Sequence, residues 1–248
     1  MNFGGYLGES TIDYPGKLGP VLFSSGCNYK CPACHNPELV NKNLILNKEY
    51  ITTFMNMIKL RKDFIKGITI SGGEPTIQAG LPFFLKDLKK ELGLPIKLDT
   101  NGSNYQMLGE LLENKLVDYI SLDVKGPTHL YADLIGREHF DTRDGIEKSI
   151  SIVTQFPNYE FRTTIVPIVR RNGEISFLTP EEIKNTAELI DSCIFSNDKE
   201  NKYFLQKFIP AKTGLLDKKL EEFPETPDKL MQECYEAAKE ILPSCKIR

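Results

Sequence analysis

The 248-residue chain has 34 acidic and 31 basic side chains, a net charge of −3, and 40% hydrophobic residues. This composition is typical of a globular protein long enough to bury a substantial core, and it argues against a disordered chain. It gives no basic surface for nucleic acid or anionic membrane, and no apolar run approaches the ~18 residues of a membrane-spanning helix. The first residues lack the basic and apolar regions of a signal peptide, so we expect a cytoplasmic protein.

Short apolar runs alternate with amphipathic segments along the chain. After a strand and turn over residues 3–18, we expect strands at 20–24, 67–71, 95–99, 119–123, 159–166 and 203–209. Apolar residues at helical spacing predict helices at 47–60, 79–92, 104–115, 144–156, 180–192 and 227–242, with Asn47 and Thr179 as N-caps. A looser stretch is expected over residues 127–142.

This alternation predicts βαβ units and a parallel sheet. Six units are too few for a closed eight-fold barrel, so we predict an α/β fold with a partial (βα)6 TIM-like barrel, open on one side. A doubly wound sheet is the alternative. Because internal repeats and low-complexity linkers are lacking, we expect one domain over residues 1–248, with its core at about 18–210 and a C-terminal helix at about 227–242.

The most informative stretch, residues 25–36, follows the strand expected at 20–24. Cys27, Cys31 and Cys34 lie there in a C-x3-C-x2-C pattern. Soft thiolate ligands suit zinc or iron–sulfur clusters, and clustered cysteines in a reducing compartment favour metal binding or chemistry over disulfides. A cubane cluster usually takes four thiolates. Three therefore leave one position that is either open, as a reactive site requires, or filled by another kind of ligand.

Other interpretations of these cysteines stay open at this point. His35 could complete a Cys3His zinc site, or Cys31 and Cys34 could form a thioredoxin-like redox pair. The three thiols could also be buried without a metal. The remaining cysteines, Cys193, Cys234 and Cys245, show no ligand spacing and are expected to be packed thiols.

Polar motifs follow three further predicted strands at the points where those strands end. They are Gly72-Gly73-Glu74-Pro75, Asp99-Thr100-Asn101-Gly102 and Asp123-Val124-Lys125. The carboxyl ends of parallel strands share one rim, so these motifs and the cysteine loop should surround one pocket. Glycines let a ligand approach the backbone, carboxylates accept hydrogen bonds from an ammonium group or ribose, and a lysine pairs with a carboxylate. Each motif alone is common in turns and caps, and their coincidence on one rim carries the prediction.

This set of motifs resembles the radical S-adenosylmethionine (SAM) enzymes. The C-x3-C-x2-C loop looks like their cluster-binding signature, and Gly72-Gly73-Glu74-Pro75 looks like their motif for the methionine amino group. Over nearly the whole chain the sequence resembles the small activases of glycyl radical enzymes, most closely the anaerobic ribonucleoside-triphosphate reductase activating proteins. The matching stretches are residues 10–17, 34–39, 71–76, 98–103, 123–125 and 161–167.

The resemblance implies a cofactor and a reaction. Cys27, Cys31 and Cys34 would be the metal ligands and catalytic residues, holding one [4Fe-4S] cluster whose fourth iron binds SAM. The reduced cluster would cleave SAM to methionine and a 5′-deoxyadenosyl radical, which removes hydrogen from a glycine of a partner glycyl radical reductase. The implied electron donor is a low-potential protein such as flavodoxin or ferredoxin, and neither nucleic acid nor membrane is an expected partner.

The resemblance also implies the SAM contacts, namely Gly72, Gly73, Glu74, Asp99, Thr100, Asn101, Asp123, Lys125 and Arg162. The two glycines and Asp99 would face the amino group, Asp123 and Lys125 the ribose and carboxylate, and Arg162 a carboxylate or the incoming glycine loop. In some activases the residues matching Asp99, Thr100 and Asp123 also hold a monovalent cation. Ala33 is a departure from the family, which usually has an aromatic residue beside adenine at that position.

Two other functions stay open. One is a radical SAM enzyme that acts on a small molecule or peptide, as in deazapurine synthesis. The other is a non-catalytic zinc-binding module.

Overall fold

The computed structural model describes residues 1–41, 44–137, 143–194, 202–210 and 214–248. The strands are β1 Phe3–Tyr14, β2 Lys17–Ser24, β3 Ile68–Gly72, β4 Ile96–Thr100, β5 Tyr119–Asp123, β6 Tyr159–Ile165, β7 Pro167–Val169, β8 Ile175–Phe177, β9 Tyr203–Lys207 and β10 Lys246–Ile247. The α-helices are α1 Pro37–Val40, α2 Lys48–Leu60, α3 Leu81–Leu92, α4 Tyr105–Glu113, α5 Tyr131–Ile135, α6 Arg143–Val153, α7 Pro180–Ser192 and α8 Asp228–Ile241. Single 3₁₀ turns occur at Pro75–Ile77, Thr128–Leu130 and Lys218–Leu220.

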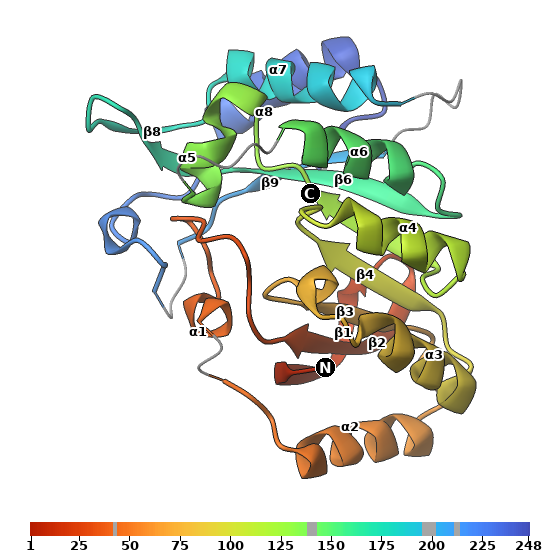
Figure 1. Cartoon of the computed structure of the whole chain (residues 1–248). Helices are drawn as coiled ribbons and strands as arrows, with labels where there is room; N and C mark the ends of the chain where they lie inside the picture. Colours follow the sequence, from red (N-terminus) through yellow and green to blue (C-terminus); the bar gives the residue numbers. More distant parts are fainter. Residues whose placement is uncertain (42–43, 138–142, 195–201, 211–213) are drawn as a thin grey trace.

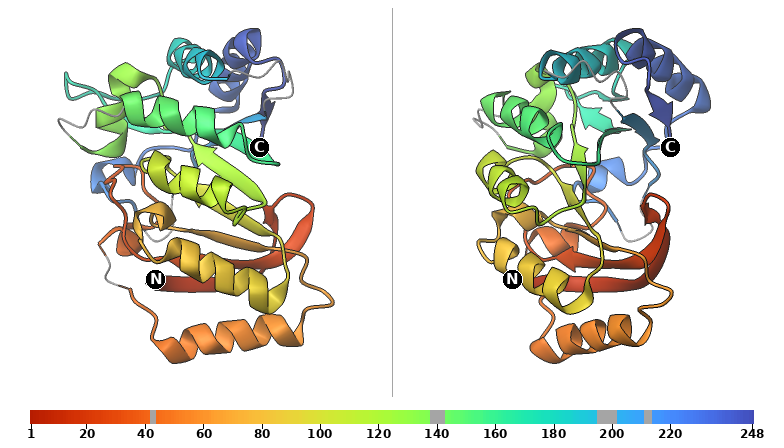
Figure 2. Two further views of the ribbon diagram at one scale, coloured as in Figure 1. Left: turned by 45° about the vertical axis from the view of Figure 1, so that its right-hand side comes forward. Right: turned by 90° about the vertical axis from the view of Figure 1, so that its right-hand side faces the viewer.

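One eight-stranded sheet organises the chain, in the order β1-β2-β3-β4-β5-β6-β9-β10. Neighbouring strands from β2 through β10 are parallel, and β1 pairs with β2 in the antiparallel sense. Figures 1 and 2 show the helices around the outer side of this curved sheet. The order of the described strands ends at β1 and β10, so the barrel is open. The predicted partial barrel of six parallel βα units, with strands β2, β3, β4, β5, β6 and β9, is confirmed.

The sheet has an apolar outer face and a polar inner face because side chains alternate along each strand. The outward residues, for example Ile70 of β3, Leu98 of β4 and Leu122 of β5, are fully buried in the main core. The core continues into the helices through residues such as Leu85 of α3 and Leu108 of α4. The intervening strand residues therefore face the barrel interior, and most of them are polar or charged.

Helix starts follow the capping chemistry expected from the sequence. The Asn47 side chain accepts a hydrogen bond from the Tyr50 N–H at 3.1 Å and begins α2. Thr179 and Glu182 form a reciprocal capping box at the start of α7. Both predicted N-caps are confirmed, and a cap of this kind stabilises a helix by ~1 kcal/mol.

Several short elements were not predicted. The β7–β8 hairpin has two three-residue strands and β10 has two residues, too few for a hydrophobic period to emerge. The helix α5 lies within the stretch expected to be loose, of which residues 138–142 fall outside the described residues. The strand β2 begins at Lys17, earlier than predicted, because it pairs with the long edge strand β1. Among the described helices, none is long and apolar enough to cross a membrane.

Candidate functional site

The cysteine loop lies between β2 and α1 and is held by its backbone. Backbone hydrogen bonds tie it to other parts of the chain, among them Gly26 N to Leu39 O at 2.6 Å, Lys30 N to Ile135 O at 2.8 Å, Asp217 N to Pro32 O at 3.0 Å and Leu216 N to Cys34 O at 3.3 Å. The loop is thus anchored by α1, by α5 and by the segment before Lys218–Leu220. Since main-chain groups make these contacts, the side chains of the loop remain available for chemistry.

The three thiols of the loop are free and half-buried. Burial raises the pKa of Cys27 to about 12 and also raises the pKa of Cys31. The Cys27 Sγ accepts a hydrogen bond from the Tyr29 N–H at 3.4 Å and from the Asn101 Nδ2–H at 3.8 Å. In the part of the chain that the structure describes, no three Cys, His, Asp or Glu side chains are already arranged as a metal site. Cys27, Cys31 and Cys34 nevertheless line one cavity.

The glycine turn after β3 packs directly on the start of the cysteine loop. Gly73 donates its N–H to Ser24 O at 2.9 Å, and Glu74 donates its N–H to Gly26 O at 2.8 Å. A Cβ added at Gly73 would lie 2.2 Å from Gly26 O. Gly72 has φ +112°, a backbone conformation that favours glycine. The sequence Gly72-Gly73 is therefore required by the close approach of two backbones.

Glu74 links this turn to the next one. Its carboxylate is fully buried and accepts hydrogen bonds from Thr76 N–H at 3.0 Å, Thr100 Oγ1–H at 2.8 Å and Asn101 N–H at 2.7 Å. Burial raises the pKa of Glu74, and these hydrogen bonds oppose that rise. The Glu74 carboxylate thus holds the turn after β4 against the turn after β3, through hydrogen bonds to other groups of the protein.

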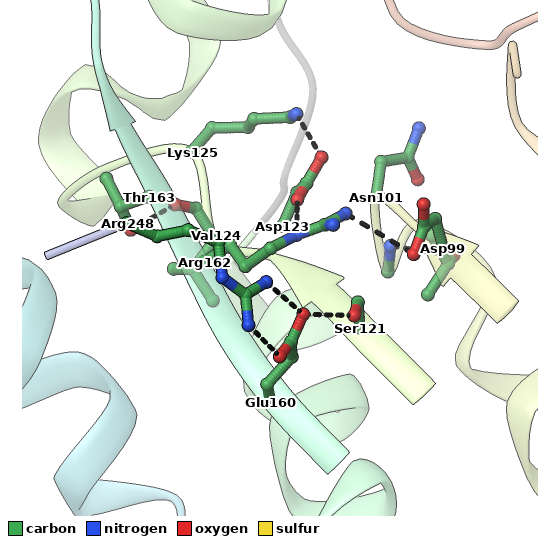
Figure 3. Close-up of polar contacts among 12 residues, drawn as sticks. Asp99, Asn101, Ser121, Asp123, Val124, Lys125, Glu160, Arg162, Thr163 and Arg248 are labelled. Atoms are coloured by element: carbon green, nitrogen blue, oxygen red, sulfur yellow. Dashed lines mark hydrogen bonds and ion pairs between the residues drawn. The ribbon is translucent and has the colours of Figure 1, made fainter. Parts of the chain in front are cut away.

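The charged residues of the site form a connected set on β4, β5 and β6 (Figure 3). Asp123 accepts hydrogen bonds from Lys125 Nζ and from Arg162 Nε, each at 2.9 Å. Asp99 pairs with the buried Lys97 and lies 3.6 Å from the second guanidinium nitrogen of Arg162. Burial alone would raise the pKa of Asp123, but Arg162 and Lys125 outweigh it and hold that pKa well below its usual range.

These elements enclose a cavity of about 270 Å³ at the carboxyl ends of the parallel strands. Every residue proposed for the site from the sequence lines it: Cys27, Cys31, Cys34, Gly72, Gly73, Glu74, Asp99, Thr100, Asn101, Asp123, Lys125 and Arg162. Ala33, at the position expected beside adenine, and His35, the alternative zinc ligand, also line it. Other lining residues were not assigned from the sequence: Tyr29, Asn36, Ser71, Val124, Leu134, Thr164 and Val166. Thr164 follows Arg162 at a spacing of two, so strand alternation on β6 could have found it.

His35 is engaged by the chain that follows β9. Its ring stacks on Phe208 with centroids 5.7 Å apart and planes 19° apart, and its Nε2 lies 2.9 Å from Ile209 O. Ala33 packs against the small apolar cluster around Phe208. The rim of the cavity near Ala33 is thus built by the end of β9 as well as by the cysteine loop. One of the two ring nitrogens that the Cys3His zinc interpretation could use, Nε2, is engaged in this contact.

The cysteines outside the loop are packed in the core. Cys193, Cys234 and Cys245 are buried, and burial raises the pKa of Cys234 and Cys245 to about 12. Their position agrees with the expectation of packed thiols.

Comparisons with known proteins agree with this geometry. The Radical SAM superfamily matches residues 21–190. A protein of Methanocaldococcus jannaschii with the provisional name glycyl-radical enzyme activating enzyme is 31% identical over 247 residues, covering 98% of this chain and 94% of that protein. The pyruvate formate-lyase-activating enzyme of Streptococcus mutans is 31% identical over 125 residues, which cover 46% of this chain and 47% of that enzyme.

Solved structures share the fold at low sequence identity. A radical SAM methyltransferase from Sphaerobacter thermophilus gives a TM-score of 0.66 at 11% identity, over 95% of this chain and 67% of that one. Streptococcus suis SuiB, bound to its precursor peptide SuiA, gives a TM-score of 0.63 at 14% identity, over 92% of this chain and 48% of that one. From the cysteine loop, the open parallel barrel and these matches together, we conclude that the chain belongs to the radical SAM superfamily and, within it, to the glycyl-radical enzyme activating enzymes.

Proposed function

We propose that this protein cleaves SAM reductively and uses the resulting 5′-deoxyadenosyl radical to generate a glycyl radical on a large partner enzyme. The observation that carries the proposal is the convergence of the cysteine loop, the glycine turn and the charged set of β4, β5 and β6 on one cavity. The match to the Methanocaldococcus jannaschii protein over 98% of the chain supports it. We propose that residues 1–248 act as one radical SAM domain, because the sheet runs from β1 to β10 over a shared core.

The residues present fit the cofactors that this function requires. Three thiols at the mouth of one cavity suit an iron–sulfur cluster with one open iron position. When bound, the reduced cluster supplies the electron that breaks the C–S bond of SAM. We propose that Cys27, Cys31 and Cys34 hold the cluster, and that the Gly72-Gly73 turn, which lines the same cavity, presents its backbone to the methionine part of SAM.

The charged residues have separable tasks in this proposal. The Lys125 side chain is 30% exposed, whereas Arg162 is 15% exposed and bridges Asp123 and Asp99. Lys125 can therefore turn to the carboxylate of SAM while Arg162 continues to neutralise Asp123. We do not extend the proposal to a monovalent cation, because Lys97, Lys125 and Arg162 already balance the carboxylates that would bind one.

The size of the cavity favours a protein as the second substrate. A volume of about 270 Å³ lies just below the roughly 300–1,000 Å³ of small-molecule pockets. SAM would take up much of this space, so a further substrate has to approach from the mouth, as an extended protein loop can. We propose an anaerobic ribonucleotide reductase as the partner, on the sequence resemblance, with a low-potential flavodoxin or ferredoxin as electron donor and the reducing cytoplasm as the compartment.

The test is an anaerobic assay of the protein reconstituted with iron and sulfide and reduced with dithionite. We expect 5′-deoxyadenosine from SAM, and a glycyl radical signal by electron paramagnetic resonance when the anaerobic reductase of the same genome is added. A pyruvate formate-lyase-type enzyme serves as the matched alternative partner. A radical on the second enzyme alone would correct the partner, and a protein that binds zinc without iron or sulfide would overturn the function.

A further inference from the structure

A buried carboxylate lies below the site, inside the barrel. Glu160 of β6 is fully buried and accepts hydrogen bonds from Tyr119 Oη–H at 2.8 Å and Ser121 Oγ–H at 2.7 Å. The Arg248 guanidinium donates to both of its carboxylate oxygens, each at 3.0 Å, and lies 4.1 Å from the centre of the Phe204 ring. Figure 3 shows the two guanidinium nitrogens of this fork facing the two carboxylate oxygens of Glu160. A bidentate arginine pair of this kind is strong and directional.

The pairing of β10 with β9 brings Arg248 to this position. Lys246 and Ile247 pair with Phe204 and Leu205, and the Arg248 N–H donates to Leu205 O at 2.9 Å. The side chain of Arg248 then reaches across β9 to β6. A residue at the edge of the sheet therefore completes a charge pair in the interior of the barrel.

Glu160 and Arg162 are two residues apart on β6, so both side chains point into the barrel. Arg162 consequently has carboxylates on two sides along the barrel. Asp123 and Asp99 lie toward the carboxyl ends of the strands, and Glu160 lies toward the strand starts. Burial alone would lower the pKa of Arg162, but Asp123, Asp99 and Glu160 together raise it. Among the contacts of the described residues, the hydrogen bonds and ion pairs of the Arg162 guanidinium go upward to Asp123 and Asp99, while Glu160 is bound by Arg248.

We infer that Arg248 is a positioning residue: by neutralising Glu160 it leaves the Arg162 guanidinium directed at Asp123 and Asp99, where SAM binds. The physical reason is competition. A buried carboxylate without a partner attracts the nearest cation, and Arg162 is on the same face of the same strand. If Arg248 lost its charge, Arg162 would turn toward Glu160 and withdraw from Asp123. This inference rests on the proposed function for its effect on SAM, but the orientation of Arg162 can be measured without SAM.

The test compares Arg248→Gln with the double variant Glu160→Gln/Arg248→Gln in the reconstituted protein. The first leaves a buried anion unpaired, and the second removes anion and cation together. We expect Arg248→Gln to weaken SAM binding about tenfold, a size typical of coupled residues in one ion-pair network. We expect the double variant to bind SAM within about twofold of the wild type, because Arg162 no longer has a competing carboxylate. The exposed neighbour Lys246→Gln is the matched control and should change nothing.

The independent readout is the Nε–Hε resonance of Arg162 in ¹⁵N-arginine-labelled protein, assigned by its loss in Arg162→Lys. This resonance should move in Arg248→Gln and return in the double variant. A resonance that stays unchanged in Arg248→Gln, or equal losses of SAM affinity in the single and double variants, would show that Arg248 has only a structural role.

If Arg248→Gln does not fold, the double variant decides the question. An Arg162 resonance at its wild-type position in the double variant supports the inference, and a displaced resonance overturns it. A wild-type protein that fails to bind SAM would refute the proposed function, and the resonance would still test the position of Arg162.

Discussion

At the cysteine loop, backbone hydrogen bonds to α1, α5 and the segment before Lys218–Leu220 fix the chain, and the three thiols are free. In the barrel interior between β4 and β6, the side chains hold one another through ion pairs: Lys125 and Arg162 pair with Asp123, and Arg248 pairs with Glu160. The first region can lose a side chain without losing its shape. The second region cannot, because removing one member leaves its buried partner without compensation. Substitutions at the loop should therefore change activity with little change in stability. Substitutions in the interior should change both activity and stability.

The largest expected effect is at the loop. Cys34→Ala removes a proposed cluster ligand at a half-buried position, so we expect loss of the cluster and of 5′-deoxyadenosine formation with little change in melting temperature. Cys234→Ala in α8 is the matched control, because its thiol is fully buried in the core. It should lower the free energy of unfolding by ~1–2 kcal/mol and keep the cluster. Iron analysis and thermal unfolding of both variants check the prediction. A Cys34→Ala protein that retains iron and turnover would contradict it.

Gly73→Ala tests whether the two backbones must touch. The new Cβ would lie 2.2 Å from Gly26 O and 2.7 Å from Gly26 C, so the turn and the cysteine loop must move apart. We expect SAM affinity to fall about tenfold, because this turn lines the cavity and a tenfold loss is about 1.4 kcal/mol, the size of one lost hydrogen bond. Gly109→Ala within α4 is the control, because its Cβ meets nothing within 4 Å. That change should stabilise the protein by ~0.5–1 kcal/mol and leave SAM binding unaltered. Equilibrium dialysis of SAM and denaturant unfolding distinguish the two outcomes.

The sequence alone located the rim of the site but not the interior beneath it. Cys27, Cys31 and Cys34, the glycine turn and Asp99 and Asp123 follow strand ends, and parallel topology requires strand ends to share one edge. The fold was predictable for the same reason, because short apolar runs such as residues 119–123 coincide with strand β5 as observed. Helix starts at Asn47 and Thr179 followed from capping chemistry.

The rest depends on contacts between residues far apart in sequence. Glu160 and Arg248 are separated by 88 positions, and only the pairing of a two-residue strand, β10, brings them together. The Glu74 carboxylate likewise accepts a hydrogen bond from the turn after β4, and a motif match cannot show that contact. The stacking of His35 on Phe208 joins a loop near the start of the chain to the end of β9. No local signal in the sequence reports contacts of these kinds.

The interior predicts a pH dependence with a defined sign. Burial alone would raise the pKa of Glu160, but hydrogen bonds from Arg248 and Ser121 outweigh it and lower that pKa in the folded protein. A lowered folded pKa gives stability that is present above the unfolded value of about 4.3 and is lost as pH falls toward the folded value. Glu160→Gln should therefore reduce the free energy of unfolding by ~2 kcal/mol at pH 7 and by less at pH 4. Urea unfolding of the metal-free protein at both pH values checks this. An equal loss at both would show that the Glu160 charge does not contribute.

The smallest expected effect lies where the two regions meet, at Asn101. Its side-chain N–H donates to the Cys27 sulfur at 3.8 Å and to Asn28 Oδ1 at 3.1 Å. Hydrogen bonds to cluster sulfurs help to set the reduction potential, because they stabilise the more negative, reduced state. Asn101→Ala should therefore lower the potential of the cluster. A hydrogen bond worth ~1 kcal/mol corresponds to at most ~40 mV for one electron.

A redox titration followed by electron paramagnetic resonance measures this shift, with Asn114→Ala as the control. The Asn114 amide donates to Glu110 O at 2.8 Å on the exposed side of α4, so its loss should leave the potential unchanged. A potential that rises or stays constant in Asn101→Ala would mean that the bound cluster turns the Cys27 sulfur away from this amide. A fall of a few tens of mV with an unchanged melting temperature would place Asn101 with the loop, where side chains adjust chemistry, and not with the interior, where they maintain the fold.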